Sequence, residues 1–83
     1  MMMKINKIYF RQLVAYQEAR DEESEKKKGW AYMRDTIQAG IDAGIIEDLT
    51  IEEVDKMLPH EVIEINNKFL KALTESIQPE TKN

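Results

Sequence analysis

The strongest constraint on the fold is a stripe of apolar residues between the chain's two prolines, Pro59 and Pro79. The stripe consists of Val62, Ile65, Phe69, Leu73 and Ile77, with Ile63 and Leu70 beside it. Because these residues recur at spacings of three and four, they share one face of an α-helix. Pro59 suits the first turn of such a helix, and Pro79 cannot continue it. The pattern therefore predicts an amphipathic helix over residues 59–77 that must bury one face.

A second helix is predicted over residues 25–43. Its apolar stripe steps by three and four residues through Trp30, Met33, Ile37 and Ile41. Gly44 follows at the place where a residue in the left-handed conformation commonly ends a helix. Gly40 lies four residues before Gly44, and we explain the pair by a helix end and a tight contact with a neighbouring segment.

Between these two helices the sequence predicts an extended link over residues 45–49 and a short helix over residues 50–57. Thr50 and Glu53 match the capping box, in which each side chain bonds to the backbone N–H of the other residue. Pro59 ends the short helix, because its ring disfavours helical backbone angles at the preceding residue.

Residues 7–23 are predicted to form the first helix, with Asn6 as its N-cap. The apolar face of this helix is Ile8, Tyr9, Leu13 and Tyr16. A strand stays an alternative for residues 7–16, because apolar and aromatic side chains also alternate there. The charge run at residues 21–28 is either a solvated connector, with Ser24 capping the next helix, or part of one long helix.

Together these elements predict an all-α fold, a small bundle of three to four helices over about 7–23, 25–43, 50–57 and 59–77. The 83 residues suffice for one small domain, and an apolar fraction of 42% argues against disorder. Two further arrangements stay open for the first two helices, a long hairpin and one continuous helix. Residues 1–6 and 78–83 are expected to be flexible ends.

Residue types that carry catalysis or bind metal ions are scarce. The chain has no cysteine and a single histidine, His60, which excludes thiolate chemistry and histidine clusters. We interpret His60 as an ordinary surface or capping residue. Counted from Asp42, the third and fifth positions are Gly44 and Ile46, so the calcium-loop pattern fails. The glycines form no phosphate-binding fingerprint. We therefore expect no enzyme activity, no cofactor and no metal site.

Two classes of partner, nucleic acids and membranes, are disfavoured. Lys26, Lys27 and Lys28 beside Trp30 could contact a phosphate backbone. The acidic residues just before them would repel the same phosphates, and the net charge is −4. No apolar run is longer than four residues, whereas a membrane span needs about 20. The start of the chain is too polar for a signal peptide, so we expect a cytoplasmic protein.

Charge is distributed unevenly along the chain. Residues 1–34 hold eight basic and five acidic side chains, whereas residues 35–83 hold four basic and eleven acidic ones. No basic residue occurs between Asp35 and Asp55. This stretch predicts an acidic surface formed by Asp42, Glu47, Asp48, Glu52, Glu53 and Asp55. Such a surface can engage a basic partner, or it can face the basic part of the same monomer.

Apolar side chains lie around most of the first helix rather than along one stripe. A domain of this size has a small core, which would struggle to cover them all. We therefore expect a homo-oligomer or a protein partner laid against this helix. A well-filled monomer core is the competing explanation. The predicted interface residues are Tyr9, Phe10, Leu13, Val14, Tyr16 and Trp30.

One further pattern spans the chain from Trp30 to Leu73, just over half of its length. It comprises a helix, a glycine turn, the capped segment LTIEEVDKM and a terminal amphipathic helix. The residues that carry it are Trp30–Arg34, Ala43–Ile46, Leu49–Met57, Pro59 and Val62. In this order they resemble small tail-gene proteins of tailed bacteriophages and prophages, of the tail assembly chaperone type.

The resemblance implies no catalytic residues. It implies self-association and an apolar helical surface that keeps a long helical tape-measure protein soluble, in the host cytoplasm, before the tail tube polymerises around it. The leading hypothesis is therefore a non-enzymatic phage or prophage interaction protein that self-associates and assists tail assembly by binding a helical partner. The alternative is a small acidic inhibitor or mimic that binds a basic groove on a host protein.

Overall fold

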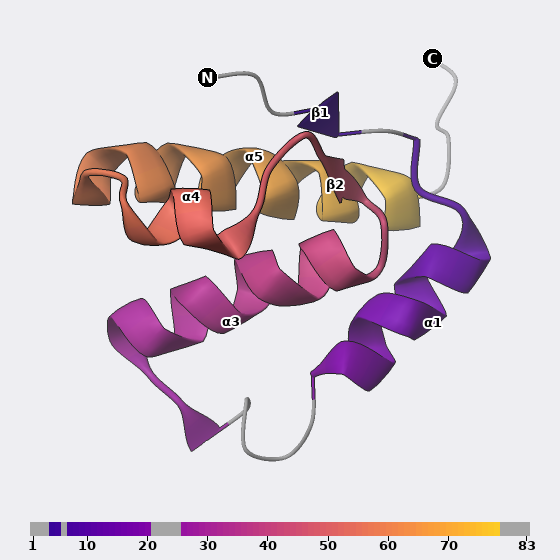
Figure 1. Cartoon of the computed structure of the whole chain (residues 1–83). Coiled ribbons are helices and arrows are strands. Elements are labelled where there is room, and N and C mark those ends of the chain that lie inside the picture. Colours follow the sequence, from indigo (N-terminus) through magenta and orange to yellow (C-terminus); the bar gives the residue numbers. More distant parts are fainter. Residues whose placement is uncertain (1–3, 6, 21–25, 79–83) are drawn as a thin grey trace.

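Four helices make up most of the structure, a computed structural model that describes residues 4–5, 7–20 and 26–78 (Figure 1). They are α1 (Phe10–Ala19), α3 (Gly29–Asp42), α4 (Ile51–Asp55) and α5 (Pro59–Ile77). The central helix, α3, contacts α1, α4 and α5. The predicted small all-α bundle is confirmed.

α1 is a helix rather than a strand, and it is shorter than the predicted range of residues 7–23. Tyr9 has extended backbone angles (φ −92°, ψ 158°), so the helix begins at Phe10. The N–H of Tyr9 donates to the side-chain oxygen of Gln12 at 2.9 Å. This bond satisfies a backbone group just before the helix start. The predicted cap, Asn6, lies outside the described residues.

α1 and α3 are separate helices, so the alternative of one continuous helix is wrong. Arg20 (φ −103°, ψ 106°) and Lys28 (φ −137°, ψ 160°) both have extended backbones. α3 therefore begins at Gly29 rather than at residue 25, and it packs against α1. The predicted cap of this helix, Ser24, lies outside the described residues.

A small antiparallel sheet, which the sequence analysis did not predict, adds to the helices. β1 (Lys4–Ile5) pairs with β2 (Ile46–Glu47), with Ile5 opposite Ile46. β2 lies within the predicted extended link over residues 45–49. Its pairing connects the first described residues of the chain to the segment that follows α3.

The two ends that we expected to be flexible, residues 1–6 and 78–83, fall mostly outside the described residues. The exceptions are Gln78, which caps the end of α5, and the two residues of β1. β1 has regular hydrogen-bonded partners.

The core lies where α3, α5 and the segment around β2 meet. Its buried apolar residues are Ile37, Ile45, Ile46, Leu49, Val54, Ile65, Phe69 and Leu73. The predicted stripe of α5 thus supplies three core residues. The stripe is not buried throughout, however, because Ile77 in the last turn is 67% exposed.

The end of α3 has the geometry that Gly44 predicts. Gly44 has a positive φ of 79°, and its N–H donates to the carbonyl of Ile41 at 3.0 Å. The N–H of Ile45 donates to the carbonyl of Gly40, also at 3.0 Å. These two bonds form the Schellman motif, which turns the chain sharply toward β2.

The predicted capping box at the start of α4 is confirmed. The N–H of Glu53 donates to the hydroxyl of Thr50 at 3.2 Å, and the N–H of Thr50 donates to the Glu53 carboxylate at 3.0 Å. α4 ends at Asp55, two residues before the predicted end. Pro59 is the first residue of α5, as its position predicts.

Candidate interaction groove

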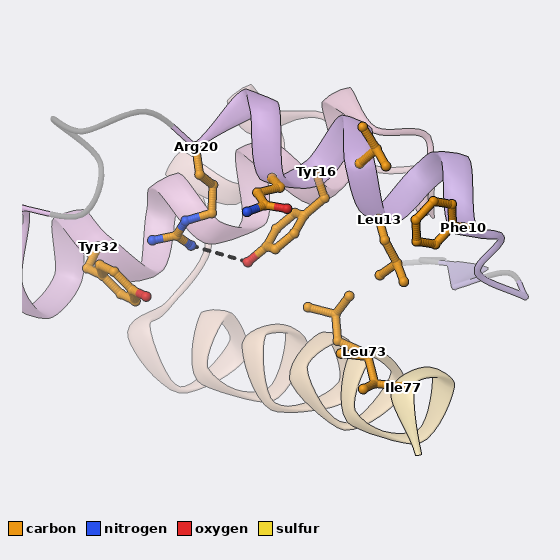
Figure 2. A pocket seen from close by; sticks show the side chains of 9 residues that line it. Phe10, Leu13, Tyr16, Arg20, Tyr32, Leu73 and Ile77 are labelled. Carbon is orange, nitrogen blue, oxygen red and sulfur yellow. Dashed lines mark hydrogen bonds between the residues drawn. The ribbon is translucent and has the colours of Figure 1, made fainter. Parts of the chain in front are cut away.

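A groove of about 520 Å³ opens between α1 and the C-terminal end of α5 (Figure 2). Its apolar part is lined by Phe10, Leu13, Val14 and Tyr16 of α1 and by Leu73 and Ile77 of α5. α1 therefore forms one wall and the last turns of α5 form the other.

The walls of the groove are exposed apolar side chains. Phe10 is 79% exposed, Ile77 is 67% exposed and Val14 is 39% exposed. Single exposed apolar residues are ordinary on protein surfaces, whereas several that line one groove indicate a surface that another apolar group covers.

The base of the groove is anchored to the core. Leu13 and Tyr16 are half-buried and pack against the buried core residues. The ring of Tyr16 meets the buried ring of Phe69 edge-on, with 5.3 Å between the ring centroids and 74° between the ring planes. The groove is therefore formed before any partner arrives, as is usual for binding sites.

Arg20 and Tyr32 form a polar end of the groove. The Nη1 atom of Arg20 donates to the hydroxyl of Tyr16 at 3.2 Å and to the hydroxyl of Thr36. The guanidinium carbon lies 4.3 Å from the centroid of the Tyr32 ring, in a cation–π contact. These contacts hold the guanidinium group in one place at the junction of α1 and α3.

The structure brings together four of the six predicted interface residues, namely Phe10, Leu13, Val14 and Tyr16. Tyr9 is 57% exposed at the start of α1 but does not line the groove. Trp30 is 61% exposed and lines a different hollow of about 190 Å³ on the other side of α3. Two apolar surfaces are therefore present where the sequence analysis expected one.

Five residues of the groove were not predicted as site residues: Gln17, Arg20, Tyr32, Leu73 and Ile77. The helical stripe of α5 had assigned Leu73 and Ile77 to the core, and Ile77 extends beyond the part of α5 that is covered. A signal for Arg20 was present, since it follows Tyr16 by four residues and so lies on the same face of a helix.

The predicted acidic residues are all exposed, and they lie on the end of α3, on β2 and its turn, and on α4. Three of them already bond within the monomer. Glu53 caps α4, the Asp42 carboxylate accepts from the Gln38 side chain at 2.9 Å, and Asp55 accepts two bonds from Arg34.

The Arg34–Asp55 pair is bidentate, with 2.8 Å for both N···O distances. Hydrogen bonding to Arg34 lowers the pKa of the Asp55 carboxyl below its ordinary value, and the same bond raises the pKa of Arg34. The pair joins α3 to α4, and its contribution to stability is small because both side chains are about half-exposed.

Other chemical sites are not evident among residues 4–5, 7–20 and 26–78. No group of three or more His, Cys, Asp or Glu side chains there could hold a metal ion. His60 is exposed in the first turn of α5. Lys27, one of the three consecutive lysines, pairs with Asp35 at 3.2 Å. No helix in the described part of the chain is long and apolar enough to span a membrane.

Comparison of the chain with protein-family models, with curated proteins and with solved structures finds no match.

Proposed function

We propose that this protein is a non-enzymatic interaction protein that binds a helix of a partner protein in the α1–α5 groove. In the absence of that partner, the same surface mediates self-association. The observation that carries the proposal is the exposure of Phe10, Val14 and Ile77 along one preformed groove. Covering these side chains with apolar groups removes their surface from water, which favours association.

The dimensions of the groove suit a helix. From Phe10 to Ala19 the wall formed by α1 rises about 13.5 Å, which is two and a half helical turns. An amphipathic helix laid along this wall presents apolar residues at positions i, i+3 or i+4, and i+7. A partner helix of this kind would lie against α1 and the last turns of α5 and would cover the exposed walls.

The resemblance to tail assembly chaperones supports a specific role for such binding. A long tape-measure protein is helical and exposes apolar surface until the tail tube surrounds it. A small protein that covers one apolar helix face at a time would keep it soluble. We therefore propose a phage or prophage tail assembly chaperone as the biological setting of the groove.

The experiment is a selection of displayed 18-residue helical peptides on the wild-type protein. Binders are then tested on Val14→Asp and on Leu70→Asp. The two positions are matched, because Val14 is 39% exposed in the groove, whereas Leu70 is 42% exposed on α5 and does not line the groove. We expect the binders to lose affinity for Val14→Asp at least tenfold and to keep it for Leu70→Asp. Binders unaffected by Val14→Asp would contradict the proposal.

Self-association is tested separately by sedimentation velocity over a range of protein concentrations. We expect the wild-type protein and Leu70→Asp to form oligomers and Val14→Asp to be more monomeric. A wild-type protein that stays monomeric at high concentration would contradict the proposed self-association. The proposed helix binding would then depend on the selection experiment alone.

The exposure of the predicted acidic residues favours a second candidate function, an acidic mimic that blocks a basic groove on a host protein. Glu47, Asp48 and Glu52 are exposed on one stretch of chain that has no basic residue. Neutralising all three to amides should abolish binding to a basic target if this function holds, whereas Val14→Asp should leave that binding unchanged.

A further inference from the structure

We infer that the helix bound in the groove carries a carboxylate side chain that pairs with Arg20. The groove would then select apolar helices with one Asp or Glu at a fixed position. This inference rests on the proposed function, because it specifies the chemistry of the helix that the α1–α5 groove accepts.

The groove carries a single kind of charge, which is positive. Arg20 is the charged residue among those that line it, and the others are apolar or neutral. The described ion pairs join Lys27 to Asp35 and Arg34 to Asp55, and neither involves Arg20. Within the described residues, the hydrogen-bond acceptors of Arg20 are two neutral hydroxyl groups. The cation therefore lies beside an apolar groove without a described carboxylate.

Arg20 also has a hydrogen-bond donor that is not satisfied within the described residues. The Nη2 atom of Arg20 is shielded from solvent and has no hydrogen-bond partner among the described residues. A buried donor without an acceptor is costly, and more so when it carries charge. Because Arg20 lines the groove, a carboxylate brought by a partner is the countercharge that best compensates this cation. Apolar walls strengthen such a pair, because they lower the local dielectric.

The position of the Arg20 side chain is already fixed in the monomer. Bonds to Tyr16 and Thr36 fix Nη1, and the Tyr32 ring lies against the guanidinium plane. Figure 2 shows the side chain extending from the end of α1 toward Tyr32, with Phe10 at the opposite end of the groove. Pairing with a partner therefore costs little additional side-chain entropy of Arg20.

The spacing of the groove fixes where the acidic residue belongs in the partner. Leu13 lies in α1, and Arg20 follows it by seven residues as the C-cap of that helix, a rise of about 10 Å, or close to two turns. A partner helix parallel or antiparallel to α1 therefore places its carboxylate about seven residues from the apolar side chain that packs between Leu13 and Leu73.

The test uses the same displayed helical library, selected in parallel on the wild-type protein and on Arg20→Met. We expect wild-type binders to be enriched in Asp or Glu seven residues from a large apolar residue, and Arg20→Met binders to lack this enrichment. The best wild-type peptide is then compared with its Glu→Gln version. We expect at least a tenfold loss of affinity on the wild-type protein and no loss on Arg20→Met. Arg11→Met, an exposed position on α1, is the matched control and should behave as wild type.

The outcomes separate the inference from the function on which it rests. Helical binders that depend on Val14 but show no acidic preference, and that tolerate Glu→Gln, overturn the role of Arg20 and leave the groove's function standing. If no helical binder depends on Val14, the proposed function fails and the inference fails with it. The Glu→Gln comparison needs only the wild-type protein, so it decides the matter even if Arg20→Met does not fold.

Discussion

Gly40 of α3 lies so close to Phe69 of α5 that a Cβ atom on the glycine would come within 2.7 Å of the ring's Cζ atom. It would also come within 2.8 Å of Cδ1 of Ile46. Gly40, Phe69 and Ile46 are all buried. The absent side chain is therefore what lets α3 pack directly on the centre of the core, next to the α5 helix that forms one wall of the groove.

Replacing Gly40 by alanine should lower the free energy of unfolding. Overpacking a filled core costs about 1–3 kcal/mol, whereas alanine gains about 1 kcal/mol over glycine in a helix. Because the contacting atoms belong to a buried ring and a buried side chain, we expect a net loss of up to about 2 kcal/mol. Urea unfolding of both proteins measures it. Phe69→Leu removes the clashing ring atoms, so Gly40→Ala should cost less in that background; equal costs would show that the close contact is not the cause.

Thr50→Ala should destabilise the protein by about 1 kcal/mol, the usual cost of losing an N-cap side chain. The variant removes the hydroxyl that accepts from the N–H of Glu53 at 3.2 Å. Thr50→Ser keeps that acceptor and serves as the control. Thermal unfolding followed by circular dichroism gives both values, and equal midpoints for the two variants would argue against the cap.

The sequence predicted those features that depend on local patterns. The stripe from Val62 to Leu73, the turn at Gly44 and the cap at Thr50 each follow from spacing or from backbone preference, and each is confirmed. Such signals lie within a few residues of one another, so one sequence suffices to read them.

The features that the sequence missed depend on contacts between distant segments. β1 pairs with β2 across some forty residues of chain, and two-residue strands have no periodic signature. The groove likewise joins α1 to the last turn of α5. The exposure of Ile77 depends on which segments cover the last turn of α5, which is a property of packing. Arg20 becomes part of the site only because α1 lies beside Thr36 and Tyr32.

Asp48→Val should destabilise the turn after β2. Asp48 has a positive φ of 62°, a conformation that asparagine and aspartate tolerate and β-branched residues do not. We expect a loss of about 1–2 kcal/mol from this strain. Glu47→Val, one residue earlier in β2, is the control, because valine suits an extended strand. Urea unfolding that ranks Glu47→Val as the less stable protein would contradict this reading of the backbone.

The Arg34–Asp55 pair should make a small contribution to stability that depends on pH. The folded pKa of Asp55 is lowered by its bond to Arg34, so folding favours the ionised carboxylate. The contribution is complete above the ordinary pKa of 3.8 and is lost as the pH falls through the folded value. In Arg34→Met, NMR titration of the Asp55 carboxyl should give a pKa nearer the ordinary one. An identical titration curve in both proteins would show that the pair does not persist in solution.

Two neighbouring residues of α1 should separate the role of the groove in binding from the stability of the fold. Phe10 is 79% exposed, whereas Leu13 is half-buried and packs against the core. Phe10→Ser should therefore change the free energy of unfolding by less than about 0.5 kcal/mol, whereas Leu13→Ala should cost about 1–2 kcal/mol.

In sedimentation and peptide-binding measurements, by contrast, Phe10→Ser should have a clear effect. It should weaken association although the protein stays folded. The reason is that water already covers most of the Phe10 ring in the monomer, so its burial contributes only when a partner arrives. If Phe10→Ser unfolds as readily as Leu13→Ala, the ring is covered within the monomer in solution, and the exposed wall on which the binding proposal depends would be absent.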